Sequence, residues 1–179
     1  HRPACLAVRA DRQGIDRPLG KLARAQQLAA AFGMMALLGT EKVRVHVLNT
    51  AGGAPTSMPP SRGRASLMKL FGFLDWVEEG GDQALDDGVE QFLKRHVGRG
   101  VTILLSDFLT VGDLRRTFNR LLSAGQESFA VQILGPTEIA PEVGGDRRFI
   151  DPATPATLDV SCNADLLRLY HEDRLGLGD

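Results

Sequence analysis

The stretch Val101-Thr-Ile-Leu-Leu-Ser-Asp-Phe-Leu-Thr110 decides the fold that the sequence predicts. Its first five residues form an apolar run that is too short for a buried helix and indicates a strand covered on both faces, as in the centre of a parallel sheet. Ser106 and Asp107 follow at the carboxyl end of this strand, where open α/β sheets place their ligand crevice. Thr110 and Asp113 have the spacing of a capping box, ahead of helically spaced apolar residues at Leu114, Phe118, Leu121 and Leu122. We therefore predict a strand, a polar turn with one acidic group at its mouth, and a helix.

The rest of the chain alternates between strand and helix patterns. We predict strands at residues 4–8, 43–47 (with Arg44 and His46 on a polar face), 129–133, 148–151 and 157–161, the last two forming a hairpin. The apolar spacing of residues 22–36 predicts a helix that ends at Gly39. Further helices are predicted at 67–77, at 85–96 (capped by Asp82) and after Asn163. Residues 49–64 are predicted to be a long surface connection. This alternation predicts an α/β fold with a mostly parallel sheet and helices on both faces.

Composition and charge narrow the class of protein. With 179 residues, of which 43% are hydrophobic and 24% charged, we expect one globular domain spanning residues 1–179. The net charge of -1 gives no general attraction to nucleic acid or anionic lipid, so no nucleic-acid partner is expected. The longest membrane-like run is far below the roughly 20 residues that cross a bilayer, which predicts no membrane contact by this chain and a cytoplasmic location. Because the sequence opens on His1, we expect a fragment of a longer chain, which can itself be membrane-anchored.

The sequence lacks the motifs that several kinds of catalytic and binding site require. There is no phosphate-binding Gly-rich loop and no Gly-x-Ser-x-Gly nucleophile elbow. Zinc is not expected, because Cys5 and Cys162 are distant and the histidines at 46, 96 and 171 are isolated in sequence. Two reduced, buried thiols are predicted at Cys5 and Cys162, with a single disulfide as the alternative.

The remaining candidate is a hard-cation site at the carboxyl edge of the sheet. Asp11 follows the first strand, Asp107 follows the central strand, and the loop Gly80-Gly-Asp-Gln83 precedes a helix. Oxygen ligands from three loops suit Mg²⁺, with waters completing the octahedron. The alternative is that Asp11 is a solvated loop residue and that Asp107 caps or tethers its own turn.

The order of motifs resembles a known bacterial family. The segments are Lys21-Leu-Ala-Arg-Ala-Gln-Gln-Leu-Ala-Ala-Ala31, Pro59-Pro-Ser-Arg-Gly-Arg64, Leu104-Leu-Ser-Asp-Phe-Leu109, Val131-Gln-Ile-Leu-Gly-Pro-Thr-Glu138 and Arg148-Phe-Ile-Asp151. Together they resemble the domain of unknown function 58 family, whose conserved part looks like a von Willebrand factor A domain. The resemblance implies a Rossmann-like sheet with a metal-ion-dependent adhesion site of the pattern Asp-x-Ser-x-Ser, a Thr and an Asp.

The match to that adhesion site is uneven. Asp11 and Asp107 occupy the acidic positions, but Gln13 and Ile15 stand where hydroxyls belong, and Gln83 falls at or near the Thr position. The resemblance therefore implies a degenerate metal site of Asp11, Gln13, Gln83 and Asp107, holding either no cofactor or weakly bound Mg²⁺.

Three functions follow as expectations. The first is a non-enzymatic adaptor or scaffold module that binds another protein, with a MoxR-type AAA+ ATPase as the partner that the resemblance implies and the 49–64 segment and edge loops as its surface. The alternative is a Mg²⁺-dependent phosphatase or receiver-type phosphoacceptor using Asp11 and Asp107, which also requires a nearby lysine. No lysine follows a late strand in this sequence. The third is a domain that only stabilises its parent chain.

Overall fold

The computed structural model describes residues 4–8, 20–48, 56–78, 80, 83–96, 98–109, 113–139, 145–150 and 157–162. The chain divides into two compact units, His1–Gly135 and Pro136–Asp179, and each is described by itself. The expectation of one domain over residues 1–179 stays a prediction.

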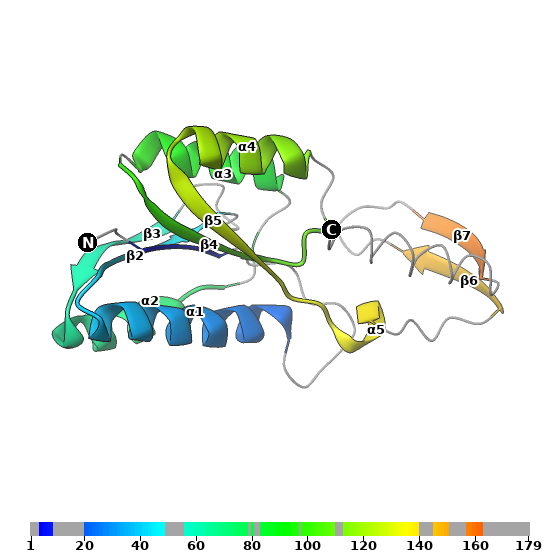
Figure 1. Ribbon diagram of the computed structural model, residues 1–179. Coiled ribbons are helices and arrows are strands. Elements are labelled where there is room, and N and C mark those ends of the chain that lie inside the picture. Colours follow the sequence, from blue (N-terminus) through cyan, green and yellow to red (C-terminus); the bar gives the residue numbers. More distant parts are fainter. Residues whose placement is uncertain are drawn as a thin grey trace. The chain divides into compact units, whose positions relative to one another are not determined.

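The first unit is built on a five-stranded sheet with the order β3-β2-β1-β4-β5 (Figure 1). Its strands are β1 (Ala4–Val8), β2 (Lys42–Val47), β3 (Thr56–Arg62), β4 (Gly100–Ser106) and β5 (Gln126–Gln132). All neighbours pair in parallel except β3, which runs antiparallel to β2 at one edge. The predicted mostly parallel sheet is therefore confirmed, with β4 between β1 and β5.

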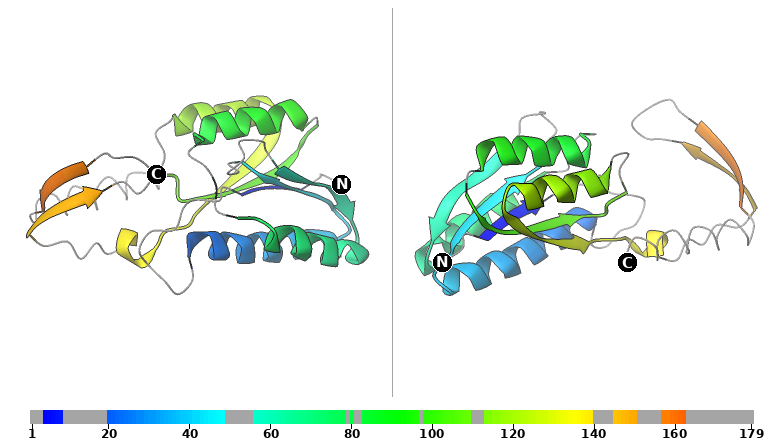
Figure 2. Two further views of the ribbon diagram at one scale, coloured as in Figure 1. Left: turned by 180° about the vertical axis from the view of Figure 1, so that it is seen from behind. Right: turned by 45° about the horizontal axis from the view of Figure 1, so that its top comes forward.

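Helices cover both faces of this sheet, as the two views of Figure 2 show. On one face lie α1 (Lys21–Leu38) and α2 (Leu67–Asp75), the latter preceded by the short 3-10 helix η1 (Arg64–Ser66). On the other face lie α3 (Leu85–Arg95) and α4 (Leu114–Ser123). Among the described helices, none combines the length and the apolar character that crossing a bilayer requires.

β4 supplies side chains to both halves of the core. Leu105 packs with α1 and α2, and Leu104 packs with α3 and α4; neither side chain is exposed. Alternate residues of a strand point to opposite faces, so an apolar run is what burial on both sides requires. The sequence-based interpretation of residues 101–105 as a doubly covered strand is confirmed.

The interpretation of residues 49–64 as an irregular connection is wrong for its second half. Thr56–Arg62 forms the edge strand β3, in which Met58 is buried and the pairing with β2 is irregular between Val43 and Val45. Pro59 and Pro60 obscured this strand, because proline cannot donate a ladder hydrogen bond. At the edge of a sheet the missing donor costs little.

Three further details differ from the predictions. His46 lies on the strand face that was expected to be polar, yet it is buried. Phe92 of α3 covers it in an edge-to-face contact, with the two ring centroids 4.9 Å apart. Leu122, expected to be an inner residue of α4, is 71% exposed.

The cap of α4 is Asp113, whose side chain accepts a hydrogen bond from the backbone N–H of Arg116. A cap at Asp113 starts the helix one turn later than a cap at Thr110 would.

The start of α3 also differs from its prediction. Ala84 occupies the cap position without a side-chain hydrogen bond, whereas Asp82 was expected there and lies outside the described residues. Asp86 and Asp87 in the first turn supply the negative charge that favours a helix N-terminus.

The second unit contains a β-hairpin. The short helix α5 (Pro136–Ile139) comes first, and β6 (Gly145–Ile150) then pairs antiparallel with β7 (Thr157–Cys162). The predicted terminal hairpin is confirmed. The predicted helix after Asn163 lies outside the described residues.

Candidate functional site

The candidate site lies at the carboxyl edge of the parallel strands. Asp107 directly follows Ser106, the last residue of β4. α1 begins with Lys21 at the same edge, because it follows β1 and packs back across the sheet. Topology therefore places an acidic and a basic side chain from distant parts of the sequence beside each other.

Lys21 and Asp107 form a largely buried ion pair. Lys21 Nζ lies 2.8 Å from Asp107 Oδ2, and the two side chains are only 15% and 8% exposed. The other carboxylate oxygen, Oδ1, accepts a hydrogen bond of 3.0 Å from the backbone N–H of Leu109. Both oxygens of Asp107 are thus engaged, one by an ammonium group and one by the turn that follows β4.

The turn around Asp107 is held by neighbouring groups. Ser106 Oγ accepts a hydrogen bond from the N–H of Phe108, whose backbone takes the positive φ of 57°. Gln132 of β5 donates through Nε2 to the carbonyl of Asp107 at 3.1 Å, and the N–H of Ile133 donates to the carbonyl of Ser106. These bonds from β5 fix the direction in which Asp107 presents its carboxylate. They agree with the expected alternative in which Asp107 tethers its own turn.

The predicted metal ligands are only partly described. Asp11 and Gln13 lie outside the described residues. Gln83 is half-buried and stands just before α3, whose first turns pack at the carboxyl end of β2, where Gly88 abuts Leu48. Gln83 and Asp107 therefore share one edge of the sheet, while the four-residue ligand set stays a prediction.

The described residues at this edge do not suit Mg²⁺. A divalent ion needs several oxygen ligands, and an ammonium group bonded to the carboxylate repels it. Lys21 already neutralises Asp107, the one carboxylate of the predicted set that the structure describes. Lys21 was missed by sequence reasoning, although a lysine at the first position of the helix after β1 is a usable signal.

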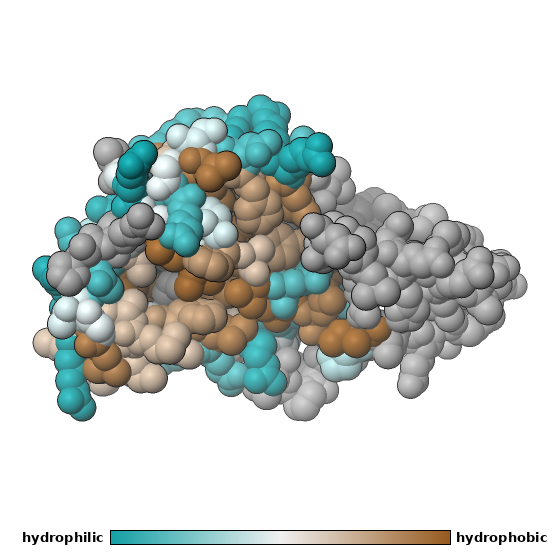
Figure 3. Space-filling model, in the orientation of Figure 1, coloured by the Kyte–Doolittle hydropathy of each residue, from teal (hydrophilic) through white to brown (hydrophobic). Residues whose placement is uncertain are grey.

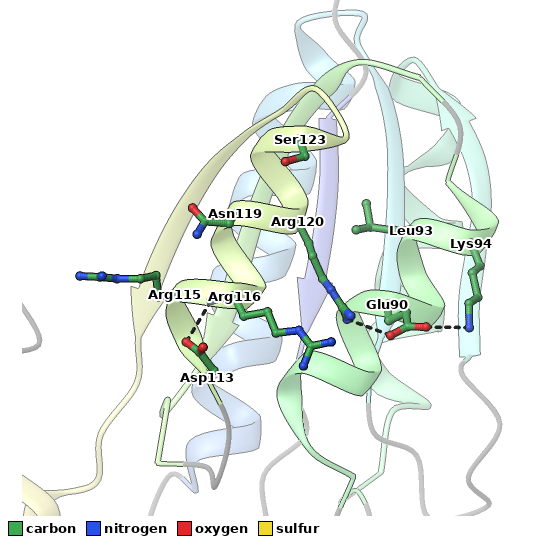
Figure 4. A pocket seen from close by; sticks show the side chains of 9 residues that line it. All are labelled: Glu90, Leu93, Lys94, Asp113, Arg115, Arg116, Asn119, Arg120 and Ser123. Carbon is green, nitrogen blue, oxygen red and sulfur yellow. Dashed lines mark hydrogen bonds and ion pairs between the residues drawn. The ribbon is translucent and has the colours of Figure 1, made fainter.

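A second feature is an open groove of about 670 Å³ between α3 and α4 (Figure 4). Glu90 lies between two cations, with oxygens 2.9 Å from Lys94 Nζ and 2.8 Å from Arg120. Hydrogen bonds from Lys94 and Arg120 lower the pKa of the Glu90 carboxyl below its usual value. These pairs lie at or near the surface, and the groove is lined mainly by the long side chains of charged and polar residues from the two helices.

A third feature contradicts the expectation that cysteine and histidine are scattered. Cys5, His46 and His96 come together in the interior, on the α3 side of the sheet. Sequence spacing gave no signal, since each residue belongs to a different element. The prediction of a free, buried thiol is confirmed for Cys5. For Cys162 it stays a prediction, because the structure does not describe that side chain.

One solved structure with a TM-score above 0.5 agrees with this fold. An aerotolerance-related membrane protein from Bacteroides fragilis NCTC 9343, carrying multiple mutations to serine, superposes with a TM-score of 0.59 at 11% identity. That match covers 96% of this chain and 87% of the other. An uncharacterized membrane-spanning protein from Vibrio fischeri gives a TM-score of 0.33 at 14% identity, over 93% of this chain and 85% of the other.

Sequence comparison assigns the family. No curated protein matches the chain significantly. The profile described as "Protein of unknown function DUF58" matches residues 13–175, which is nearly the whole sequence. The chain belongs to the DUF58 family.

Proposed function

We propose that this chain is a von Willebrand factor A-like protein-interaction module that acts without a catalytic centre and without a divalent ion at its carboxyl edge. The observation that carries this proposal is the ion pair between Lys21 and Asp107. An ammonium group 2.8 Å from the carboxylate provides the positive charge that a metal ion would otherwise provide. The edge can therefore keep its shape in the absence of a cation.

The exposed edge of the sheet supports a protein-binding role. Within the described residues β5 pairs only with β4, and Phe129 on β5 is 52% exposed. Leu122 and Leu109 are 71% and 49% exposed. Figure 3 shows apolar surface along the course that β5 takes in Figure 1. Edge strands with apolar side chains are surfaces to which an extended segment of another protein can add as a further strand.

The partner follows from the family resemblance. A MoxR-type AAA+ ATPase is the partner that we propose, with an extended segment of it pairing along β5. Because Lys21 takes the role of the cation, this contact does not depend on Mg²⁺. The DUF58 membership supports the family resemblance from which this partner is taken, and the adaptor role is our inference.

Direct binding of the purified MoxR-type ATPase from the same host tests the proposal. We expect saturable binding that is unchanged by EDTA and weakened at least about tenfold by Phe129→Glu, since a charge would be desolvated at the contact. Met68→Glu is the matched control, because Met68 is 79% exposed on α2, away from β5. Binding that EDTA abolishes and Mg²⁺ restores would contradict metal independence. Equal loss in both variants would contradict the β5 surface.

One observation favours the phosphoacceptor as a second candidate. That chemistry needs a lysine beside the acidic nucleophile, and Lys21 meets this requirement. In the reaction an oxygen of Asp107 would attack the phosphorus of acetyl phosphate and acetate would leave. Incubation with acetyl phosphate and Mg²⁺, followed by intact mass measurement, distinguishes the candidates. The interaction module predicts no added phosphoryl group, whereas addition that is lost in Asp107→Asn would favour the phosphoacceptor.

A further inference from the structure

Three potential metal ligands from distant parts of the chain converge inside the first unit. Cys5 comes from β1, His46 from β2, and His96 from the position directly after α3. One ligand atom from each lies within 4.8 Å of the others. The side chains are 1%, 4% and 7% exposed, respectively. This cluster lies away from the Asp107 site, because Cys5 pairs in register with Thr102, near the start of β4.

Three ring nitrogens of this cluster have no hydrogen-bond partner among the described residues. His46 Nε2 and both ring nitrogens of His96 are buried and unpaired, and Cys5 is a free thiol. Buried polar side-chain atoms are normally satisfied, so a group of unpaired nitrogens around a thiol points to a missing ligand. The rings are held by Phe92, which contacts His46 edge-on at 4.9 Å and stacks with His96 at 5.1 Å.

We propose that Cys5, His46 and His96 bind a zinc ion that ties β1, β2 and the end of α3 together. A thiolate and two imidazoles are a donor set that suits Zn²⁺. Tetrahedral Zn–S and Zn–N bonds of about 2.3 and 2.0 Å place ligand atoms about 3.3 to 3.6 Å apart. The three ligand atoms lie within 4.8 Å of one another in the metal-free chain, so binding requires the side chains to move closer together. The described residues supply three of the four ligands.

The electrostatic surroundings define the conditions for binding. Burial lowers the pKa of His46 to about 4 and lowers that of His96 as well, so both rings are neutral at pH 7, as metal binding requires. Burial raises the pKa of Cys5 to about 12, so the ion must displace the thiol proton. Arg44 repels a cation, yet it also favours the thiolate of Cys5. Arg95 adds to the positive charge around His46.

We expect the ion to enter beside His96, the most exposed of the three residues. Its neighbours Arg95, Gly98 and Arg99 are exposed, and Gly98 has a φ of 121°. A local opening of the segment between α3 and β4 would admit the ion without separating the strands. We therefore expect slow binding by the folded chain.

Metal titration of the chelator-treated chain tests the site. We expect one Zn²⁺ per chain by competition with a chromophoric chelator, and a higher Tm with the metal bound. In Cys162→Ser, where Cys5 is the only remaining cysteine, Co²⁺ should give the thiolate-to-metal charge-transfer absorption. This spectrum assigns Cys5 as a ligand without a substitution at Cys5 itself.

Ligand variants complete the test. Cys5→Ser and His96→Gln should each lower the affinity at least about tenfold while circular dichroism shows a folded chain. Absence of stoichiometric binding by the wild type would overturn the proposal, as would a Co²⁺ complex of Cys162→Ser without the thiolate absorption. Should Cys5→Ser fail to fold, the spectrum of Cys162→Ser decides the question.

Discussion

Lys21 Nζ contacts Asp107 Oδ2 at 2.8 Å, although 86 positions separate the two residues in sequence. The contact exists because α1 and the turn after β4 both begin at the carboxyl edge of the sheet. It places an ammonium group where the family resemblance led us to expect a metal ion. The same contact links the fold to the proposed metal-free function.

Removing this ammonium should destabilise the chain. Lys21→Met takes away the charged partner of a carboxylate that is only 8% exposed, and we expect the free energy of unfolding to fall by about 1–3 kcal/mol. Urea denaturation measures the change. Lys69→Met is the control, since Lys69 is exposed on α2, and it should change stability by no more than about 0.5 kcal/mol. Equal effects of the two substitutions would contradict a structural role for the pair.

Glycine substitutions should test the packing of α3 at the candidate edge. A Cβ at Gly88 would lie 2.9 Å from Leu48 Cβ and 3.2 Å from its carbonyl oxygen. We expect Gly88→Ala to lower stability by about 1–3 kcal/mol, because the helix must move away from β2. Gly72→Ala in α2 meets nothing within 4 Å and should raise stability by about 0.4–1 kcal/mol. Thermal unfolding of both variants checks the opposite signs.

A buried polar pair between β4 and β5 should behave as one unit. Thr102 Oγ1 donates to Gln126 Oε1 at 2.9 Å, and Gln126 Nε2 donates to the carbonyl of Gly98. Thr102→Val leaves the buried amide oxygen without its donor and should cost about 1–3 kcal/mol. In a double-mutant cycle with Gln126→Leu, the double variant should lose less than the sum of the single losses. Strict additivity would show that the two side chains do not interact.

The metal-free chain should lose stability in weak acid. Burial, with repulsion from His96, Arg44 and Arg95, lowers the folded-state pKa of His46 to about 4 from 6.5. Between these values the unfolded chain binds the proton and the folded chain does not, so stability falls as the pH drops from about 6.5 towards 4. From pH 7.5 to 5 this group accounts for roughly 2 kcal/mol.

Urea unfolding in EDTA at the two pH values, on wild type and His46→Gln, isolates this contribution. The variant should lose roughly 2 kcal/mol less than the wild type over the same interval. His96, whose pKa is also lowered by burial, keeps a smaller dependence of the same sign in the variant. Identical pH dependence in the two proteins would show that folding does not lower the pKa of His46.

The parts of the fold that could be predicted are those in which the local pattern of apolar residues matches the burial of the element in the folded chain. The run before Ser106 is apolar because both of its faces are buried, and its neighbours in sequence mark its ends. β3 could not be predicted, because Pro59 and Pro60 are compatible with an edge strand only once β2 is known to lie beside it. The buried position of His46 was missed for a similar reason: its environment is set by Phe92, which lies on another element.

The candidate site was predictable only in part. Asp107 was found because the carboxyl end of a central strand is a general ligand position, and the structure confirms where it lies. Lys21 and the Cys5, His46 and His96 cluster are products of long-range contacts, which spacing along the sequence does not encode. Asp11 and Gln13 stay predictions, since the structure does not describe them.

Calorimetric titration with Mg²⁺ and Mn²⁺ tests the metal-free edge most directly. The wild-type chain should show no saturable binding at millimolar ion concentrations, because Lys21 neutralises Asp107. Saturable binding of one ion per chain that disappears in Asp107→Asn would contradict this account and restore a functioning metal site at the carboxyl edge.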